Sequence, residues 1–211
     1  MTYDLSRLKK AVIDGDIDTV RRIAQEALIS DISAKEVSDA LASGMNIIAQ
    51  KFEDGEIFLS QLMVATDVAY EGHKVIKHEL IRIAGKAKLG TIVIGTIEGD
   101  IHDLGKNIIA AMLKGFGFEV HDLGRDVKVE NYIIKAKETN ADIIGISARN
   151  STTTIIQKRV VEAAKEAGIY PKTKVIVGGA CATPEWAEKI GAIYATSAMD
   201  VIRVIRRLVE R

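Results

Sequence analysis

The chain has 211 residues, of which 47% are hydrophobic and 27% are charged, and its 29 basic residues balance its 29 acidic ones. This length suits one large or two small domains, and the neutral balance gives no support to nucleic acid or a membrane surface as a partner. No run reaches the ~20 apolar residues of a membrane span, the N-terminus lacks a signal peptide's apolar centre, and one cysteine excludes an internal disulfide, so we expect a cytoplasmic protein.

Apolar residues recur at spacings of three and four through roughly the first eighty residues, which predicts helices. The turn Asp14–Asp16 separates the first two helices. Ser33 followed by Glu36 forms a capping box that opens the third helix, and a fourth helix is predicted from about Leu59 onwards. Since short connections join antiparallel neighbours, we expect a four-helix bundle.

A short basic segment bounded by glycines, Gly85–Gly90, interrupts the helical periodicity. We therefore place a domain boundary there, with a helical cap over residues 1–88 and a second domain over residues 89–211. Its two glycines can absorb large backbone rotations, and Lys86 and Lys88 favour solvent over packing. We expect this segment to act as a hinge.

The second half alternates strands and helices, which predicts a Rossmann-like parallel sheet with helices on both faces. Five strands suit the flavodoxin-like order 2-1-3-4-5, whose switch point lies between the first and third strands. The first strand is the β-branched run Thr91–Thr96. The other predicted strands are Phe118–Asp122, Asp142–Ser147, Lys174–Val177 and Ala192–Ala195, and the predicted helices start at Leu104 or span Val129–Thr139, Thr153–Ala167, Pro184–Ile190 and Val201–Leu208.

Polar side chains follow the two strands at the predicted switch point. Asp100 and His102 lie in the loop after the first strand, and Ser147 ends the third. The carboxylate can accept the proton of one ring nitrogen while the other nitrogen faces a metal. Taken alone the pattern stays open, because a lone loop histidine is more often a surface residue and the glycine pair Gly178 and Gly179 can simply let a loop turn.

Together these positions resemble a known signature. Asp100-x-His102-x-x-Gly105, then 41 residues, then Ser147, then the glycine pair after the fourth strand, is similar to cobalamin-binding domains that hold the cofactor with its own base displaced. The segment Gly99–Asn107 closely resembles one in methionine synthase and in corrinoid proteins of methyltransferase systems. The likeness covers the whole chain, since Glu56–Leu62 resembles their helical cap and Thr183–Gly191 their C-terminal part.

The resemblance implies a base-off, His-on cobalamin or related corrinoid. His102 would be the lower axial ligand of cobalt, Asp100 would hydrogen-bond its other ring nitrogen, and Ser147 would extend this relay. Such a triad would take up a proton when the cobalt–nitrogen bond breaks and release it when the bond reforms. The other cofactor contacts that the resemblance implies are Asp103, Gly105 and Thr152, with Gly178 and Gly179 opening a slot for the displaced base. Phe58, with Leu62 or Met63, would shield the upper methyl face, although packing in the helical core explains these three equally well.

Two departures from the family pattern accompany the match. Ser60 stands where the family usually has proline, and Arg149 and Asn150 replace apolar positions after Ser147. The second departure lies near the expected tail pocket, so it bears on which corrinoid is bound and how tightly.

The size of the chain, a cap plus a cofactor domain, resembles the stand-alone corrinoid carrier. The resemblance implies a methyl group carried on cobalt from a substrate-specific methyltransferase, with methanol, a methylamine or a methoxy compound as donor. A second methyltransferase would pass it to coenzyme M or tetrahydrofolate, and a reductive activating protein is a further candidate partner. The alternatives are a cobalamin-binding sensor without methyl transfer and a flavodoxin-like interaction domain without cofactor.

Other residues with ligand chemistry receive simpler interpretations. Cys181 is alone, offers no zinc-thiolate site, and is expected to be a small buried residue beside the glycine pair. His73 and His78 are five apart on a predicted helix, and we expect both to face solvent. His121 ends the second strand in a turn that either reaches the edge of the corrin or is merely exposed.

Overall fold

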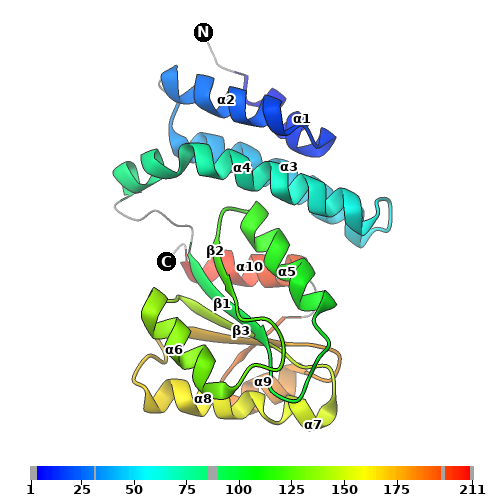
Figure 1. The fold of residues 1–211 in the computed structure, drawn as a ribbon, viewed down its shortest axis with the longest axis vertical. Helices are drawn as coiled ribbons and strands as arrows, with labels where there is room; N and C mark the ends of the chain where they lie inside the picture. The colour runs from blue at the N-terminus through cyan, green and yellow to red at the C-terminus, as the bar shows by residue number, and fades with distance from the viewer. Residues whose placement is uncertain (1–3, 31, 85–89, 196–197, 210–211) are drawn as a thin grey trace. The chain divides into compact units, whose positions relative to one another are not determined.

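The structure is a computed structural model that describes residues 4–30, 32–84, 90–195 and 198–209 (Figure 1). Contacts divide the chain into two compact units, one of residues 1–89 with 111–118 and one of residues 90–110 with 119–211. The boundary predicted after residue 88 and most of the proposed hinge, residues 85–89, lie outside the described residues.

The first unit contains the predicted helices, α1 (Ser6–Asp14), α2 (Ile17–Ile29), α3 (Ala34–Glu53) and α4 (Leu59–Ala84). The capping box at the start of α3 is confirmed, because the Glu36 amide donates to Ser33 Oγ at 3.2 Å and the Ser33 amide donates to Glu36 Oε2 at 3.1 Å. Each helix turns an apolar stripe inward, which is the arrangement that buries amphipathic helices. The buried residues include Leu8, Val12, Val20, Ile23, Val37, Leu41, Met45, Leu62 and Ile76. In the described part of the chain, no helix has both the length and the apolar character needed to span a bilayer.

The expectation that His73 faces solvent is wrong, whereas His78 is exposed as predicted. His73 is 7% exposed and lies on the same buried stripe of α4 as Ile76, three residues on. Its Nε2 is 3.2 Å from Ser38 Oγ on α3 and its Nδ1 is 2.9 Å from the Ala69 carbonyl oxygen. These hydrogen bonds satisfy the ring and allow it to be buried.

The second unit is a five-stranded parallel sheet in the predicted order β2-β1-β3-β4-β5. Figure 1 shows α6, α8 and α9 on one side of the strands, with α10 and the start of α5 on the other. The face covered by α6, α8 and α9 is packed with residues such as Val93, Ile144, Val160 and Ile190. The strands are β1 (Thr91–Thr96), β2 (Glu119–Asp122), β3 (Ile143–Ser147), β4 (Lys174–Gly178) and β5 (Ile193–Tyr194), and the helices are α5 (Leu104–Gly115), α6 (Val129–Thr139), α7 (Ser151–Thr154), α8 (Gln157–Glu166), α9 (Pro184–Ile190) and α10 (Ala198–Val209).

One predicted helix, Thr153–Ala167, is divided in the structure into α7 and α8. The hydroxyl groups of Thr153 and Thr154 both donate to the Asn150 carbonyl oxygen, at 3.0 and 2.8 Å. Such local bonds compete with the regular helical pattern. The buried Gln157 then opens α8, donating from Nε2 to the carbonyl oxygens of Ile146 and Gly178, each at 3.2 Å. The last strand is also shorter than predicted, with two residues instead of four.

The sheet register brings the ends of β1, β3 and β4 side by side. Thr96 pairs with Ser147, and Ser147 pairs with Gly178. Because all the strands are parallel, the loops that follow β1, β3 and β4 leave the same edge of the sheet. This edge carries the candidate site.

Candidate corrinoid site

The loop after β1 turns back on itself before α5 begins. The Ile97 amide donates to the Ser147 carbonyl oxygen at 3.0 Å, and the Asp100 amide donates to the Ile97 carbonyl oxygen at 3.1 Å. This turn directs the Asp100 side chain inward, where the residue is only 1% exposed. A carboxylate buried to this extent needs hydrogen-bond donors around it.

Four hydrogen bonds surround the Asp100 carboxylate. Oδ1 accepts from the His102 amide at 2.9 Å and lies 2.8 Å from His102 Nδ1. Oδ2 accepts from the Arg149 amide at 2.6 Å and from Thr153 Oγ1 at 3.2 Å. Burial alone would raise the pKa of this carboxyl, but the hydrogen bonds outweigh burial and lower the pKa from 3.8 to about 2. Asp100 is therefore an anion at neutral pH.

His102 is held on one side and open on the other. Its side chain is 45% exposed, and the ionised Asp100 carboxylate beside Nδ1 places the ring proton on that nitrogen. Nε2 then carries the lone pair, and no hydrogen bond joins it to another described residue. The arrangement presents an oriented imidazole whose Nε2 is available to bind a metal.

The hydroxyl that reaches Asp100 belongs to Thr153. In the described part of the chain, the Ser147 side chain makes no hydrogen bond to Asp100, and Ser147 instead contributes its carbonyl oxygen to the turn after β1. Sequence reasoning missed Thr153 because the short helix α7, which was not predicted as a separate element, brings its hydroxyl group to Asp100. The nearest signal was the run Thr152–Thr154, where each hydroxyl is a candidate donor; Thr152 itself is exposed.

The departures at Arg149 and Asn150 fall on residues whose backbone is used by the site. The Arg149 amide donates to Asp100, and the Asn150 carbonyl oxygen accepts from the hydroxyls of α7. Both residues are exposed. These contacts need no particular side chain, so the replacements leave the turn around Asp100 intact.

The candidate glycines separate into two kinds. A methyl group added at Gly179 would lie 1.9 Å from the Ala148 carbonyl oxygen, with φ at +113°, and one at Gly178 would lie 3.2 Å from the Ala195 carbonyl oxygen. The packing of the protein itself therefore accounts for this pair. Gly105 differs, because a methyl group there would meet no other part of the chain within 4 Å.

Two exposed apolar side chains that sequence reasoning missed flank His102. Ile101 is 66% exposed and Leu104 is 65% exposed. Asp103 between them is half-buried and precedes α5, and its carbonyl oxygen accepts from the Asn107 amide at 2.8 Å. Apolar residues beside the histidine in an otherwise polar loop were the available signal.

The remaining candidates lie in varied surroundings. Leu62 is fully buried in the helical unit, whereas Phe58 is 80% exposed and Met63 is 36% exposed, so core packing accounts for Leu62 alone. His121 is half-buried, with Nε2 2.8 Å from Glu119 Oε1. The expectation that Cys181 is buried is wrong: it is exposed, because it lies in the turn beyond the glycine pair and not beneath it.

An ion pair between a buried lysine and a more exposed aspartate, also missed, anchors the start of α5. Lys106 is 2% exposed, and its Nζ donates to both carboxylate oxygens of Asp122 at 2.5 and 2.6 Å. Asp122 ends β2, so the pair joins the first turn of the helix after His102 to the neighbouring strand end. A buried lysine requires such a partner.

Family models match both parts of the chain. One described as a B12 binding domain matches residues 90–203, and a second with the same description matches residues 5–77. Together they cover most of the α/β unit and most of the helical one.

Individual relatives agree over nearly the full length. The chain is 45% identical to the dimethylamine corrinoid protein of Methanosarcina barkeri over 205 residues, covering 97% of this chain and 96% of that one. It is similar in structure to a cobalamin-binding protein from Desulfitobacterium hafniense DCB-2, with 31% identity and a TM-score of 0.76 over 97% of this chain and 98% of that chain. It also resembles a chain of the methanol:cobalamin methyltransferase complex from Methanosarcina barkeri, with 28% identity and a TM-score of 0.78 over 98% and 80%. The chain therefore belongs to the family of corrinoid proteins built on a B12 binding domain.

Proposed function

We propose that this protein carries a methyl group on a corrinoid between two methyltransferases, with dimethylamine as the methyl donor. The observation that carries the proposal is the imidazole of His102, fixed through Nδ1 by an ionised carboxylate and open at Nε2 at the carboxyl edge of the sheet. The full-length similarity to a dimethylamine corrinoid protein supports the choice of donor. A second methyltransferase would pass the methyl group to coenzyme M or tetrahydrofolate, and a reductive activating protein would restore the cofactor.

The residues at this edge fit a corrinoid held base-off and His-on. His102 offers one nitrogen ligand, so the other ligands of a metal bound there would come from the corrin ring itself. The exposed side chains of Ile101 and Leu104 offer apolar surface for a macrocycle to cover. Gly105 leaves open space at the start of α5, where the nucleotide tail would pass close to the backbone.

The chain's own contribution is orientation and control of one proton. When bound, the cobalt of the corrinoid supplies the nucleophile that accepts the methyl group and the centre that later releases it. Asp100 keeps the ring proton on His102 Nδ1, which leaves Nε2 as the nitrogen available to a metal. Thr153 and the Arg149 amide hold the carboxylate in place, which contributes to the orientation of the imidazole. Ser147 remains a proposed member of the relay, and Asp103, Thr152, Gly178 and Gly179 remain proposed cofactor contacts.

The proposed function is tested by loading the protein with hydroxocobalamin and supplying a methyl donor. We expect about one corrinoid per chain to remain bound through gel filtration. After reduction, isotope-labelled dimethylamine with a cognate methyltransferase should transfer label to the protein-bound fraction, and monomethylamine or methanol should transfer little. Corrinoid binding without labelling from any methylamine would favour the sensor alternative, and a folded protein that stays colourless would overturn the proposal as a whole.

Replacing His102 with alanine removes the imidazole that would bind cobalt, while the proposed contacts to the corrinoid tail remain. We expect His102→Ala to bind corrinoid more weakly, by about tenfold, with an absorption spectrum that lacks a nitrogen ligand below cobalt. His121→Ala is the matched control, because this histidine lies in the same unit and pairs with Glu119. An unchanged spectrum in His102→Ala would show that another group is the ligand.

Gly105→Ala separates cofactor binding from protein stability. The added methyl group meets no protein atom within 4 Å, and alanine is the better helix former, so the free energy of unfolding of the unliganded protein should stay the same or rise by up to ~1 kcal/mol. Corrinoid affinity should fall by about tenfold or more if the tail passes this backbone. Undiminished affinity, measured by titration with hydroxocobalamin, would remove Gly105 from the binding site.

The lowered pKa of Asp100 predicts a pH dependence of stability in the unliganded protein. Because the folded-state pKa of about 2 lies below the ordinary 3.8, the ionised carboxylate stabilises the fold above pH 4, and this contribution is lost as the pH falls from about 4 towards 2. The contribution is about 2 kcal/mol at neutral pH, of which about 1 kcal/mol should be lost by pH 3. Denaturant unfolding at pH 6 and pH 3 should show this additional loss relative to Asp100→Asn. Equal losses in the two proteins would contradict the assignment.

A further inference from the structure

Asp126 adopts a backbone conformation that residues with a side chain rarely adopt. Its φ is +54°, and in the described part of the chain the only other non-glycine residue with positive φ is Asn140, at +48°. Asn140 has an ordinary reason for this conformation, because it is the C-cap of α6. Asp126 caps no helix, so its strained conformation calls for another explanation.

The contacts of Asp126 provide that explanation. Its Oδ1 accepts from the Gly99 amide at 2.8 Å, and its own amide donates to the Asp100 carbonyl oxygen at 3.1 Å. Asp126 therefore holds both the backbone amide of Gly99 and the backbone carbonyl group of Asp100. Both bonds require the backbone amide and the carboxylate of Asp126 to face the same loop.

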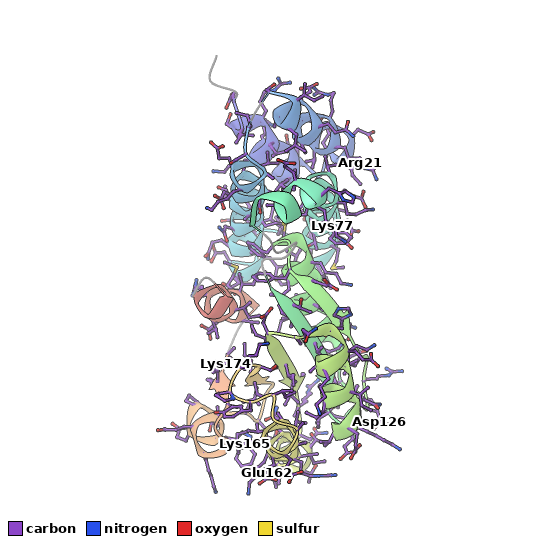
Figure 2. All side chains as sticks on the ribbon, turned by 90° about the vertical axis from the view of Figure 1, so that its left-hand side faces the viewer. Arg21, Lys77, Asp126, Glu162, Lys165 and Lys174 are labelled. Atoms are coloured by element: carbon purple, nitrogen blue, oxygen red, sulfur yellow. The ribbon has the colours of Figure 1, made fainter. Side chains whose placement is uncertain are left out.

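The segment that contains Asp126 is itself firmly attached to β1. Beyond the end of β2, the Leu123 amide donates to the Ile94 carbonyl oxygen at 2.8 Å, and the Val127 amide donates to the Thr96 carbonyl oxygen at 3.0 Å. Ile97 and Val127 form a further parallel bridge. Figure 2 shows Asp126 on this green part of the chain, at the outer side of the α/β unit. The segment thus provides a rigid support for the turn after β1.

We infer that Asp126 is a positioning residue, which fixes the Gly99–Asp100 backbone and thereby the direction in which Asp100 holds His102. The inference rests on the proposed role of His102 as the cobalt ligand. Asp100 is tied to the β3–α7 segment through its carboxylate, but its backbone is tied to the β2–α6 segment through Asp126. Without the second attachment the carboxylate keeps its partners while the peptide units around it can rotate, and the imidazole shifts with them.

Three variants distinguish the effect of the Asp126 carboxylate from the effect of the positive φ at this residue. Asp126→Gly relaxes the positive φ but removes the acceptor for the Gly99 amide. Asp126→Asn keeps both an acceptor oxygen and tolerance of this conformation. Asn140→Gly is the matched control, because it makes the same kind of change at the other positive-φ residue, away from the loop. Glycine relieves strain in two of the variants and asparagine tolerates this conformation in the third, so we expect all three proteins to fold.

The first readout needs no cofactor. In the unliganded protein, amide hydrogen exchange at Gly99 should be about tenfold faster in Asp126→Gly, because one charge-assisted hydrogen bond is lost, and within about twofold of the natural protein in the other two variants.

The second readout is the spectrum of the protein loaded with cob(II)alamin, in which electron paramagnetic resonance reports a nitrogen ligand on cobalt. The ratio of His-ligated to unligated cobalt should fall by about tenfold in Asp126→Gly and should be restored by Asp126→Asn. A natural protein without the nitrogen signal would refute the proposed ligand. A natural protein with the signal, together with an Asp126→Gly protein of unchanged ratio, would refute the role of Asp126 and leave the proposed function standing.

Discussion

The hydrogen-bonded burial of Asp100 is the interaction on which the rest of the site depends. A carboxylate that is 1% exposed would be unfavourable without partners, and here four donors converge on it, two from its own loop and two from the segment after β3. The same bonds that stabilise the anion connect the end of β1 to the end of β3. The carboxylate that holds the two loops together is therefore also the group that orients the His102 ring.

Around this carboxylate the chain uses backbone groups where sequence reasoning looked for side chains. The amides of Arg149, His102 and Gly99 and the carbonyl oxygens of Asp100 and Ser147 provide most of the contacts that shape the turn. Backbone contacts constrain geometry and leave side chains free. This explains how Arg149 can stand in place of an apolar residue without disturbing the carboxylate.

Much of the fold could be predicted from the sequence, and the errors share a physical origin. The helical unit, the parallel sheet and its strand order follow from periodicity and from the chain connectivity, which act over short distances. His73 and Cys181 were misplaced because burial depends on which face of an element meets a neighbour and on where a turn leads. The hydrogen bond between Ser38 and His73 joins two different helices, so no local sequence pattern predicts it. The exposure of Cys181 depends in the same way on where the turn after the glycine pair leads.

The site divides in the same way. The sequence by itself determined that Asp100 and His102 lie two residues apart in the loop after the first strand, and that Ser147 ends the strand beside it. Only the tertiary structure decided that Thr153 supplies the hydroxyl and that Asp126 holds the Gly99–Asp100 backbone. The reason is that the positions of the strand ends follow from the connectivity within one sheet. A hydrogen bond to a given oxygen instead requires atoms to be placed to within tenths of an ångström. Here that placement is set by the short helix α7 and by Asp126, a strained residue far along the chain.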